Sequence, residues 1–296
     1  MSDEFRLLPD EAALVGRTAP LPSVRRVATQ TPSGEVSALV WGDAPAVTLL
    51  HGAALNAHTW DATLLALGRD AIALDLPGHG DSAWRDDFDY SPAVNAEAAA
   101  AVIDAVAPGV PQAIVGHSLG GLSAIALAAT RPDLVSALVI VDVSPGLRLG
   151  DAAQVSDFLT GPQVFPSREA IVESALAAGI GDDRATLARG VELNTRVRDD
   201  GSVIWKHHFG NPPQDGTFGS AGLRDLTLLW PGLTEADVPV LLVRGATGYL
   251  APEVVEEFRE KVPRAIVVEL ATGHNVQEQD PVGLAAAISG FLSGLA

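Results

Sequence analysis

A serine between two glycines lies where a short apolar segment gives way to an alanine-rich one. The pentapeptide Gly116-His117-Ser118-Leu119-Gly120 directly follows the apolar run 112–115 and opens the helix-like segment 122–129. Because glycine has no Cβ atom, the two glycines let a strand and a helix approach closely and permit a strained turn between them. Such a turn lifts the Ser118 hydroxyl out of a sheet, and the helix N-terminus behind it favours negative charge. This context predicts a strand–turn–helix unit with Ser118 as a candidate nucleophile.

Short apolar runs recur along the rest of the chain and alternate with alanine-rich segments of helical character. The alternation predicts an α/β fold with a mostly parallel sheet that helices cover on both faces. The first two runs, 24–31 and 36–41, are joined at Pro32-Ser33-Gly34 and are expected to form an antiparallel pair. The other expected strands are 46–50, 71–74, 113–115, 137–141, 240–243 and 265–268.

The alternation stops between about Pro145 and Thr234. We therefore predict a core domain from residues 1–143 and 237–296, with an inserted, mainly helical cap over residues 144–236 at the carboxyl edge of the sheet. Asp200-Gly201 indicates a tight hairpin turn within the cap. Aromatic side chains in the cap either line an apolar binding roof or pack the cap itself, and the sequence leaves both open. They are Phe158, Phe165, Trp205, Phe209, Phe218 and Trp230.

Composition excludes several classes of partner and chemistry. The 296-residue chain has a formal net charge of −18, which argues against nucleic acid and against anionic membrane surfaces, since both need basic patches. Without cysteine there are no disulfides, thiolate zinc sites or cysteine nucleophiles. The pair His207-His208 does not predict a metal site either, because adjacent residues of an extended segment point to opposite faces. We expect instead a cap hairpin in which one of the two histidines faces solvent. The polar N-terminus and the lack of a long uncharged apolar stretch lead us to expect a cytoplasmic protein without a cofactor.

A serine hydroxyl is a poor nucleophile at neutral pH, so Ser118 requires a base. His274 follows the last expected strand directly, on a loop at the carboxyl edge, and is the candidate base. An oxyanion would need two N–H donors. The backbone N–H of Leu119, at the start of the helix, is one candidate, and that of Ala53 is the other, because Gly52 permits a tight turn after the strand 47–50.

Four segments together resemble the α/β-hydrolase superfamily, in its capped serine-esterase-like branch. They are His51-Gly52, the run Asp-Leu-Pro-Gly-His-Gly-Asp-Ser at 75–82, the run 116–121 around Ser118, and Gly273-His274. The resemblance implies an eight-stranded, mostly parallel sheet and acyl-transfer or related hydrolytic chemistry. It says almost nothing about the substrate.

The position of the acid departs from the commonest pattern of that superfamily. Many members carry an aspartate in the loop after the strand that corresponds to 240–243, but the loop 244–250 has no carboxylate here and the next acid is Glu253. Some branches place the acid at the end of the strand after the nucleophile helix, where this chain has Asp142. We predict that Asp142 orients His274, with Glu253 as the alternative.

The resulting functional prediction is a serine hydrolase that cleaves an ester or lactone of a small, largely apolar substrate through an acyl-enzyme intermediate. Hydrolysis of a carbon–carbon bond next to a ketone uses similar residues in the superfamily and stays open. A non-catalytic ligand-binding protein on the same scaffold is the alternative from another class, because the loop after 243 lacks the acid. The small-molecule substrate is the partner that the sequence indicates.

Overall fold

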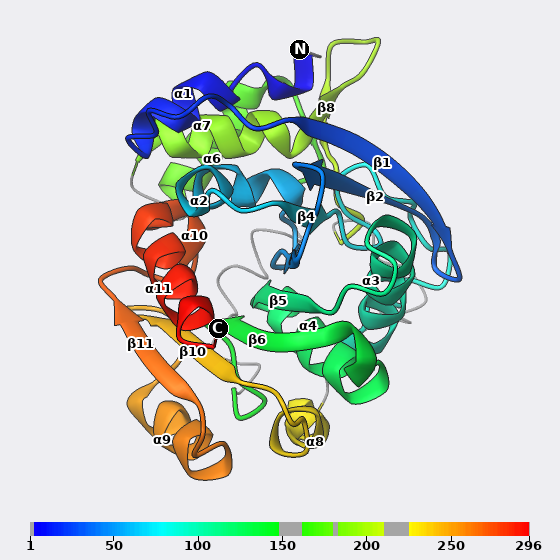
Figure 1. Ribbon diagram of the computed structural model, residues 1–296. Helices are drawn as coiled ribbons and strands as arrows, with labels where there is room; N and C mark the ends of the chain where they lie inside the picture. The colour runs from blue at the N-terminus through cyan, green and yellow to red at the C-terminus, as the bar shows by residue number, and fades with distance from the viewer. Residues whose placement is uncertain (1–2, 148–161, 180–182, 210–224, 296) are drawn as a thin grey trace.

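The centre of the molecule is a sheet of eight strands (Figure 1). The computed structural model describes residues 3–147, 162–179, 183–209 and 225–295. The spatial order is β1-β2-β4-β3-β5-β6-β10-β11, antiparallel at β1-β2 and β2-β4 and parallel elsewhere. The strands are β1 (Val24–Thr31), β2 (Gly34–Trp41), β3 (Val47–Leu50), β4 (Ala71–Leu74), β5 (Gln112–His117), β6 (Val135–Val141), β10 (Val240–Gly245) and β11 (Ile266–Leu270).

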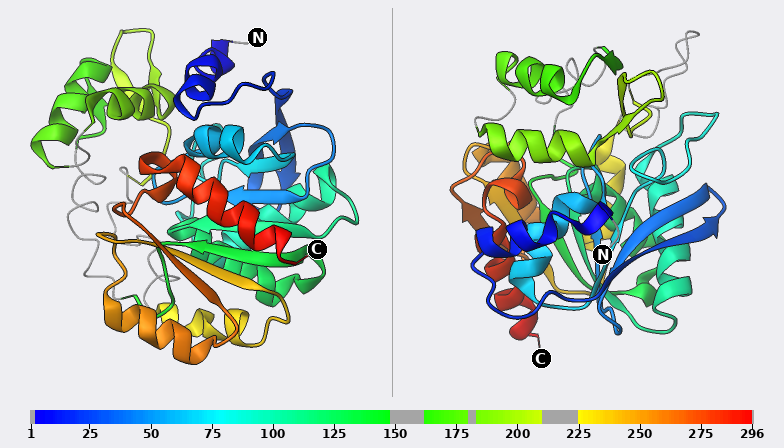
Figure 2. Two further views of the ribbon diagram at one scale, coloured as in Figure 1. Left: turned by 60° about the vertical axis from the view of Figure 1, so that its left-hand side comes forward. Right: turned by 90° about the horizontal axis from the view of Figure 1, so that it is seen from above.

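The central strands are buried on both faces because their sequences are almost continuously apolar. Side chains alternate between two hydrophobic clusters: Ile114 lies in one and its neighbour Val115 in the other. One face is covered by α1 (Leu8–Leu14), α2 (Asp61–Leu67), α10 (Val276–Gln279) and α11 (Pro281–Ser293), and the other by α3 (Pro92–Val106), α4 (Leu119–Thr130), α8 (Trp230–Thr234) and α9 (Pro252–Lys261), as Figure 2 shows. The predicted eight-stranded, mostly parallel α/β sheet is therefore confirmed.

Residues 144–236, which we call the cap segment, leave the main sheet after β6. The described part forms a small antiparallel sheet of order β7-β9-β8 and a hydrophobic cluster of its own. In Figure 1 its helix Arg184–Leu193 lies beside α1 and α2, where Arg189 pairs with Glu11 and Asp61. Its elements before α8 are β7 (Val164–Phe165), α6 (Arg168–Ala177), α7 (Arg184–Leu193), β8 (Thr195–Val197), β9 (Val203–Trp205) and the 3-10 turn Leu226–Leu229. The domain limits 1–143, 144–236 and 237–296 stay a prediction.

The hairpin predicted at Asp200-Gly201 joins β8 to β9. Gly201 has a φ of +82°, which an L side chain adopts with strain, and the Arg198 N–H donates to the Ser202 carbonyl at 2.8 Å across the turn. The antiparallel pairing of Val197 with Val203 follows from this turn.

Most cap aromatics in the described part belong to hydrophobic clusters of buried side chains. Phe165 and Trp205 lie edge to face at 5.9 Å within the cluster of the cap segment. Trp230 packs on Phe258 of α9 at 5.9 Å, in the core of the main sheet. Phe209 instead contacts His79 of the loop after β4, at 4.9 Å. Phe158 and Phe218 lie outside the described residues.

None of the helices in the described ranges has the length and apolar character that a membrane crossing requires.

His58 carries a buried charge between the N-terminal segment and α2. Its Nδ1 bonds Asp61 Oδ2 at 2.8 Å and its Nε2 lies 3.3 Å from Glu4 Oε1. Burial lowers the pKa of His58, but Asp61 and Glu4 outweigh burial and raise this pKa to about 9. The protonated imidazole therefore stabilises the folded chain.

We predict a loss of stability at alkaline pH that depends on His58. The contribution is fully present below the unfolded-state pKa of about 6.5 and is lost as pH rises through about 9, a difference of about 3 kcal/mol. Urea unfolding of wild type and His58→Gln at several pH values measures this difference in the free energy of unfolding. The two free energies of unfolding should converge above about pH 9, whereas parallel curves across this range would contradict the assignment.

Candidate active site

Ser118 lies at the turn between β5 and α4, where the sequence places it. Its φ of +52° and ψ of −120° are strained for a residue with a side chain. The Ser118 N–H donates to the Val141 carbonyl of β6 at 3.1 Å, and the Ser118 carbonyl accepts from Gly121 at 2.8 Å. His117 and Leu119 on either side are buried, but Ser118 is only half-buried. The turn therefore brings the Ser118 side chain toward the surface at the carboxyl end of β5.

The glycines of the pentapeptide are required by close backbone approach. A Cβ atom at Gly116 would collide with the backbone of Gly120. A Cβ atom at Gly120 would collide with the backbone of Leu50, the last residue of β3. The strained turn at Ser118 thus depends on two positions that accept no side chain.

Asp142 and His274 are hydrogen-bonded to each other. His274 Nδ1 lies 2.8 Å from Asp142 Oδ2. The Asp142 carboxylate is completely buried at the end of β6, and it also accepts from the Gly245 N–H at 2.9 Å and from the Tyr249 N–H at 3.0 Å. Three N–H donors stabilise a buried carboxylate without a cation. With Nδ1 donating to Asp142, His274 presents the lone pair of Nε2.

Glu253, the alternative acid, lies apart from this bond. It is an exposed residue in the first turn of α9. The structure therefore brings Asp142, and not Glu253, into contact with His274.

Tyr249 is a contact of the candidate base that the sequence analysis missed. Its ring stacks on the His274 imidazole, with centroids 3.8 Å apart and an interplanar angle of 20°. The Tyr249 N–H binds the same Asp142 oxygen that binds His274. The sequence feature that could have indicated this contact is the aromatic residue in the loop 244–250, next to the expected position of His274. This loop holds both partners of the hydrogen bond although it supplies no acid.

The loop of His274 contacts the residue before Ser118. His117 is buried, and burial holds the pKa of His117 well below its usual value, so its ring is neutral. Its Nε2 donates to the His274 carbonyl at 2.9 Å, and the two rings lie 4.6 Å apart. In the described structure the Ser118 hydroxyl is not hydrogen-bonded to His274, and such bonds often tighten only when substrate is bound.

The two predicted oxyanion donors flank Ser118. Leu119 is the first residue of α4, so its N–H has no acceptor within the helix. Ala53 follows Gly52 in the turn after β3 and is exposed. A Cβ atom on Gly52 would stand 3.3 Å from the Ser118 Cβ, so this loop lies directly against the serine turn.

His51 fixes the start of that loop from the core side. It is completely buried, and burial lowers the pKa of His51 to about 4. The neutral ring donates from Nδ1 to the Gly52 carbonyl at 2.7 Å and accepts the Leu76 N–H at Nε2, at 2.9 Å. His51 is therefore a structural hydrogen-bonder.

The histidine pair of the cap segment is more enclosed than the sequence suggested. We expected one solvent-facing histidine. His207 is buried, whereas His208 is half-buried and stacked between Trp84, at 4.3 Å, and Phe88, at 3.9 Å. The aromatic side chains of the loop 84–88 thus cover part of His208. Burial lowers the pKa of His207 to about 4. Within the described ranges, no group of three or more His, Cys, Asp or Glu side chains is arranged to hold a metal ion.

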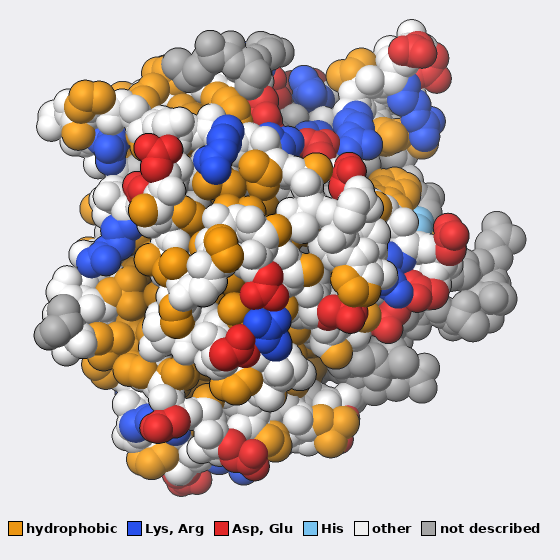
Figure 3. Space-filling view, turned by 45° about the vertical axis from the view of Figure 1, so that its right-hand side comes forward, with side chains coloured by type: hydrophobic (Ala, Val, Ile, Leu, Met, Phe, Trp, Pro, Cys, Tyr) orange, Lys and Arg blue, Asp and Glu red, His pale blue; other side chains and the backbone are white. Residues whose placement is uncertain are grey.

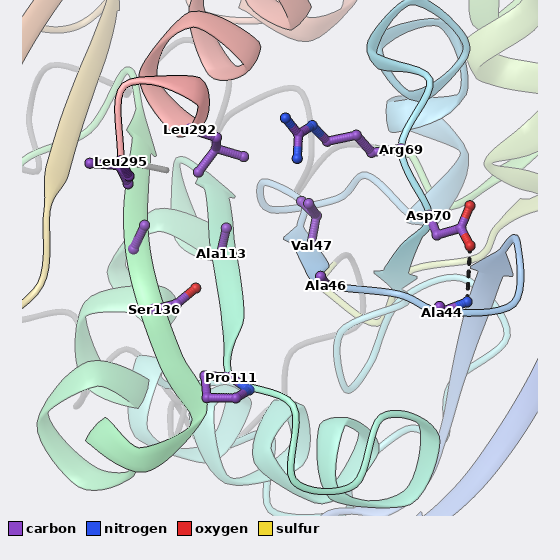
Figure 4. A pocket seen from close by; sticks show the side chains of 11 residues that line it. Ala44, Ala46, Val47, Arg69, Asp70, Pro111, Ala113, Ser136, Leu292 and Leu295 are labelled. Carbon is purple, nitrogen blue, oxygen red and sulfur yellow. Dashed lines mark hydrogen bonds between the residues drawn. The ribbon is translucent and has the colours of Figure 1, made fainter.

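A surface cavity of about 570 Å³ lies at the opposite edge of the sheet (Figure 4). It is lined where β3, β5 and β6 begin, by residues such as Val47, Ala113 and Ala137. Ser118 follows the end of β5, so the length of a strand separates the two. This cavity is therefore distinct from the candidate site.

The fold, the strained serine and the Asp142–His274 bond are those of an α/β-hydrolase. Residues 49–287 match the model of the Alpha/beta hydrolase family, so the chain belongs to that family. It is 39% identical over 300 residues to Esterase Rv0045c of Mycobacterium tuberculosis, with 98% of this chain and 96% of the relative covered. A solved structure of that esterase superimposes with a TM-score of 0.84 and 38% identity, over 98% of this chain and 99% of the other. Lipase LipV of the same organism is 29% identical over 245 residues, covering 82% and 91%. These relatives support an ester hydrolase.

We predict that the ring of Tyr249 contributes to turnover by restraining His274. Tyr249→Ala should lower kcat/KM for p-nitrophenyl butyrate about tenfold, because a freer imidazole is less often in its reactive position. Tyr249→Phe keeps the stacked ring and serves as the matched control, with a change of less than about twofold. Equal losses in both variants would assign the effect to the Tyr249 hydroxyl instead.

Proposed function

We propose that this chain is a serine carboxylesterase in which Ser118, His274 and Asp142 form a catalytic triad. The observation that carries the proposal is the 2.8 Å hydrogen bond between His274 Nδ1 and the buried Asp142 carboxylate, beside the strained serine turn. The Asp142 carboxylate also accepts the N–H groups of Gly245 and Tyr249, so its position against His274 is fixed.

In the proposed reaction the Ser118 hydroxyl attacks the ester carbonyl while His274 Nε2 takes its proton. Asp142 keeps the imidazole in the required tautomer and stabilises the imidazolium that forms. The N–H groups of Ala53 and Leu119 donate to the oxyanion of the tetrahedral intermediate. His274 then protonates the leaving alcohol and activates the water that hydrolyses the acyl-enzyme.

The proposed substrate is a small, largely apolar ester or lactone. Phe209 contacts His79 in the loop after β4. His79 in turn contacts His51, at 4.9 Å, at the start of the loop that carries the proposed oxyanion donor Ala53. The matched relatives named an esterase and a lipase act on esters according to their names. On the face in Figure 3, basic side chains lie beside acidic ones instead of forming one basic area, which supports a small molecule rather than nucleic acid as the partner.

The Asp142–His274 bond also weakens the case for a non-catalytic binding protein. That alternative depended on the absence of an acid in the loop 244–250. The loop instead donates the Gly245 and Tyr249 N–H groups to an acid that β6 supplies.

Fluorophosphonate labelling tests the nucleophile. Wild type should gain one adduct by intact-protein mass spectrometry, and Ser118→Ala should gain none while it keeps its circular dichroism spectrum and loses essentially all esterase turnover. The neighbouring Ser123, which donates to the Leu119 carbonyl at 2.7 Å inside α4, provides the control variant Ser123→Ala. An adduct of unchanged yield on Ser118→Ala would reject the proposal.

A second comparison tests the acid. Asp142→Asn should slow both labelling and turnover by about 10³- to 10⁴-fold, because an amide favours the wrong imidazole tautomer. Glu253→Gln removes the alternative carboxylate and should behave like wild type. The reverse pattern would move the acid to Glu253.

A further inference from the structure

The loop between β3 and the 3-10 turn Ala57–Trp60 contains a residue in a strained conformation. Ala54 has a φ of +61°, a value that residues with a side chain rarely adopt. It directly follows Ala53, whose N–H is one of the two proposed oxyanion donors. Strain of this kind persists only where neighbouring groups determine the conformation. The contacts of Ala54 therefore bear on the direction of the Ala53 N–H.

The contact that holds Ala54 comes from the cap segment. Asn194, at the C-terminal end of α7, donates from Nδ2 to the Ala54 carbonyl at 2.7 Å. Its Oδ1 accepts from Asn56 Nδ2, also at 2.7 Å. Asn56 Nδ2 further donates to the Leu193 carbonyl at 3.0 Å. Both asparagines are buried, with exposed fractions of 4% for Asn56 and 8% for Asn194, so these bonds do not compete with bulk water.

Asn194 is itself fixed within the cap segment. Its N–H donates to the Gly190 carbonyl at 2.9 Å, and its carbonyl accepts the Lys206 N–H at 2.8 Å. The residue therefore joins the end of α7 to the segment after β9. Nearby, α7 is attached to the core by Arg189, which donates to the His58 carbonyl at 3.2 Å. A rigid element thus presents the Asn194 amide to the loop.

The proposed oxyanion donor lies between two fixed neighbours. Gly52 on one side is held from the core by His51 and lies against Ser118. Ala54 on the other side is held from the cap segment by Asn194. The Gly52 carbonyl belongs to the same peptide plane as the Ala53 N–H, and the Ala54 carbonyl lies two peptide planes further along. The short segment 52–54 is therefore held at both ends by residues about 140 positions apart.

We propose that Asn194 is a positioning residue that holds the Ala53 N–H toward the oxyanion, so that docking of the cap segment completes the oxyanion hole. The proposal rests on the serine esterase function proposed above. It assigns the cap segment a part in stabilising the transition state in addition to any part in enclosing substrate. Because the Ala53 bond matters most when charge develops on the oxygen, loss of Asn194 lowers kcat rather than raising KM.

Two substitutions of Asn194 test this role. Asn194→Ala removes both amide bonds and should lower kcat for p-nitrophenyl butyrate about tenfold to a hundredfold, with KM changed less than about twofold, since complete loss of one oxyanion donor costs about 10²- to 10³-fold. The concentration of functional enzyme is taken from the serine labelled at completion by fluorophosphonate, so partial unfolding does not enter kcat.

The second variant, Asn194→Asp, has nearly the same shape but loses the amide donor. The new carboxyl keeps an acceptor for Asn56, but it is ionised near neutral pH and places a second oxygen against the Ala54 carbonyl. The kcat of this variant should therefore fall at least as far as that of Asn194→Ala, again with KM changed less than about twofold.

Arg196→Ala is the matched control. Arg196 links the cap segment to the core elsewhere, by donating to the Gly80 carbonyl at 3.0 Å and to Asp81 at 2.8 Å. This variant should keep wild-type kcat. A kcat loss in Arg196→Ala equal to that in Asn194→Ala would overturn the proposal by assigning the effect to general loosening of the cap segment. Wild-type kcat in both Asn194 variants would also overturn it. A wild-type enzyme that takes no fluorophosphonate adduct would instead reject the serine esterase function.

Discussion

The close approach of β5 and α4 is the constraint on which the rest of the site depends. It forces Ser118 to a positive φ and requires glycine at 116, while the close approach of α4 to the end of β3 requires glycine at 120. The same turn anchors Ser118 to β6 through the Val141 carbonyl, one residue before Asp142. Serine and acid therefore end adjacent parallel strands, and their relative position is set by the hydrogen-bond ladder between those strands. Of the three proposed catalytic residues, only His274 lies on a loop that is not part of these two strand ends.

Features encoded by local sequence were predicted well. The apolar runs predicted the strands, because strands buried on both faces have few polar positions. Asp142 was proposed as the acid because it ends such a run. The Asp-Gly turn gave the β8–β9 hairpin for the same local reason. The catalytic roles of Ser118, His274, Asp142, Ala53 and Leu119 stay predictions.

Contacts between distant segments were not predictable from one sequence. Tyr249 packs on His274 and Asn194 reaches Ala54, and neither pair has a spacing or pattern that marks it. The stacking of His208 between Trp84 and Phe88 is a further contact between distant segments that no sequence pattern marks. Such contacts are decided by tertiary packing, which overrides local preference.

The placement of the acid on β6 has a consequence for sequence change at this edge of the sheet. Asp142 takes only backbone N–H groups from Gly245 and the loop after it, apart from His274. A backbone donor does not specify a side chain, so Asp142 places no demand on the exposed residues Ala246 and Thr247, whereas Gly248 lies against the Asp142 carboxylate and Tyr249 on His274. In superfamily members whose acid lies in that loop, the same stretch has to preserve a carboxylate. In this chain, positions 246 and 247 are thus the ones in the loop that can change without disturbing the Asp142–His274 bond.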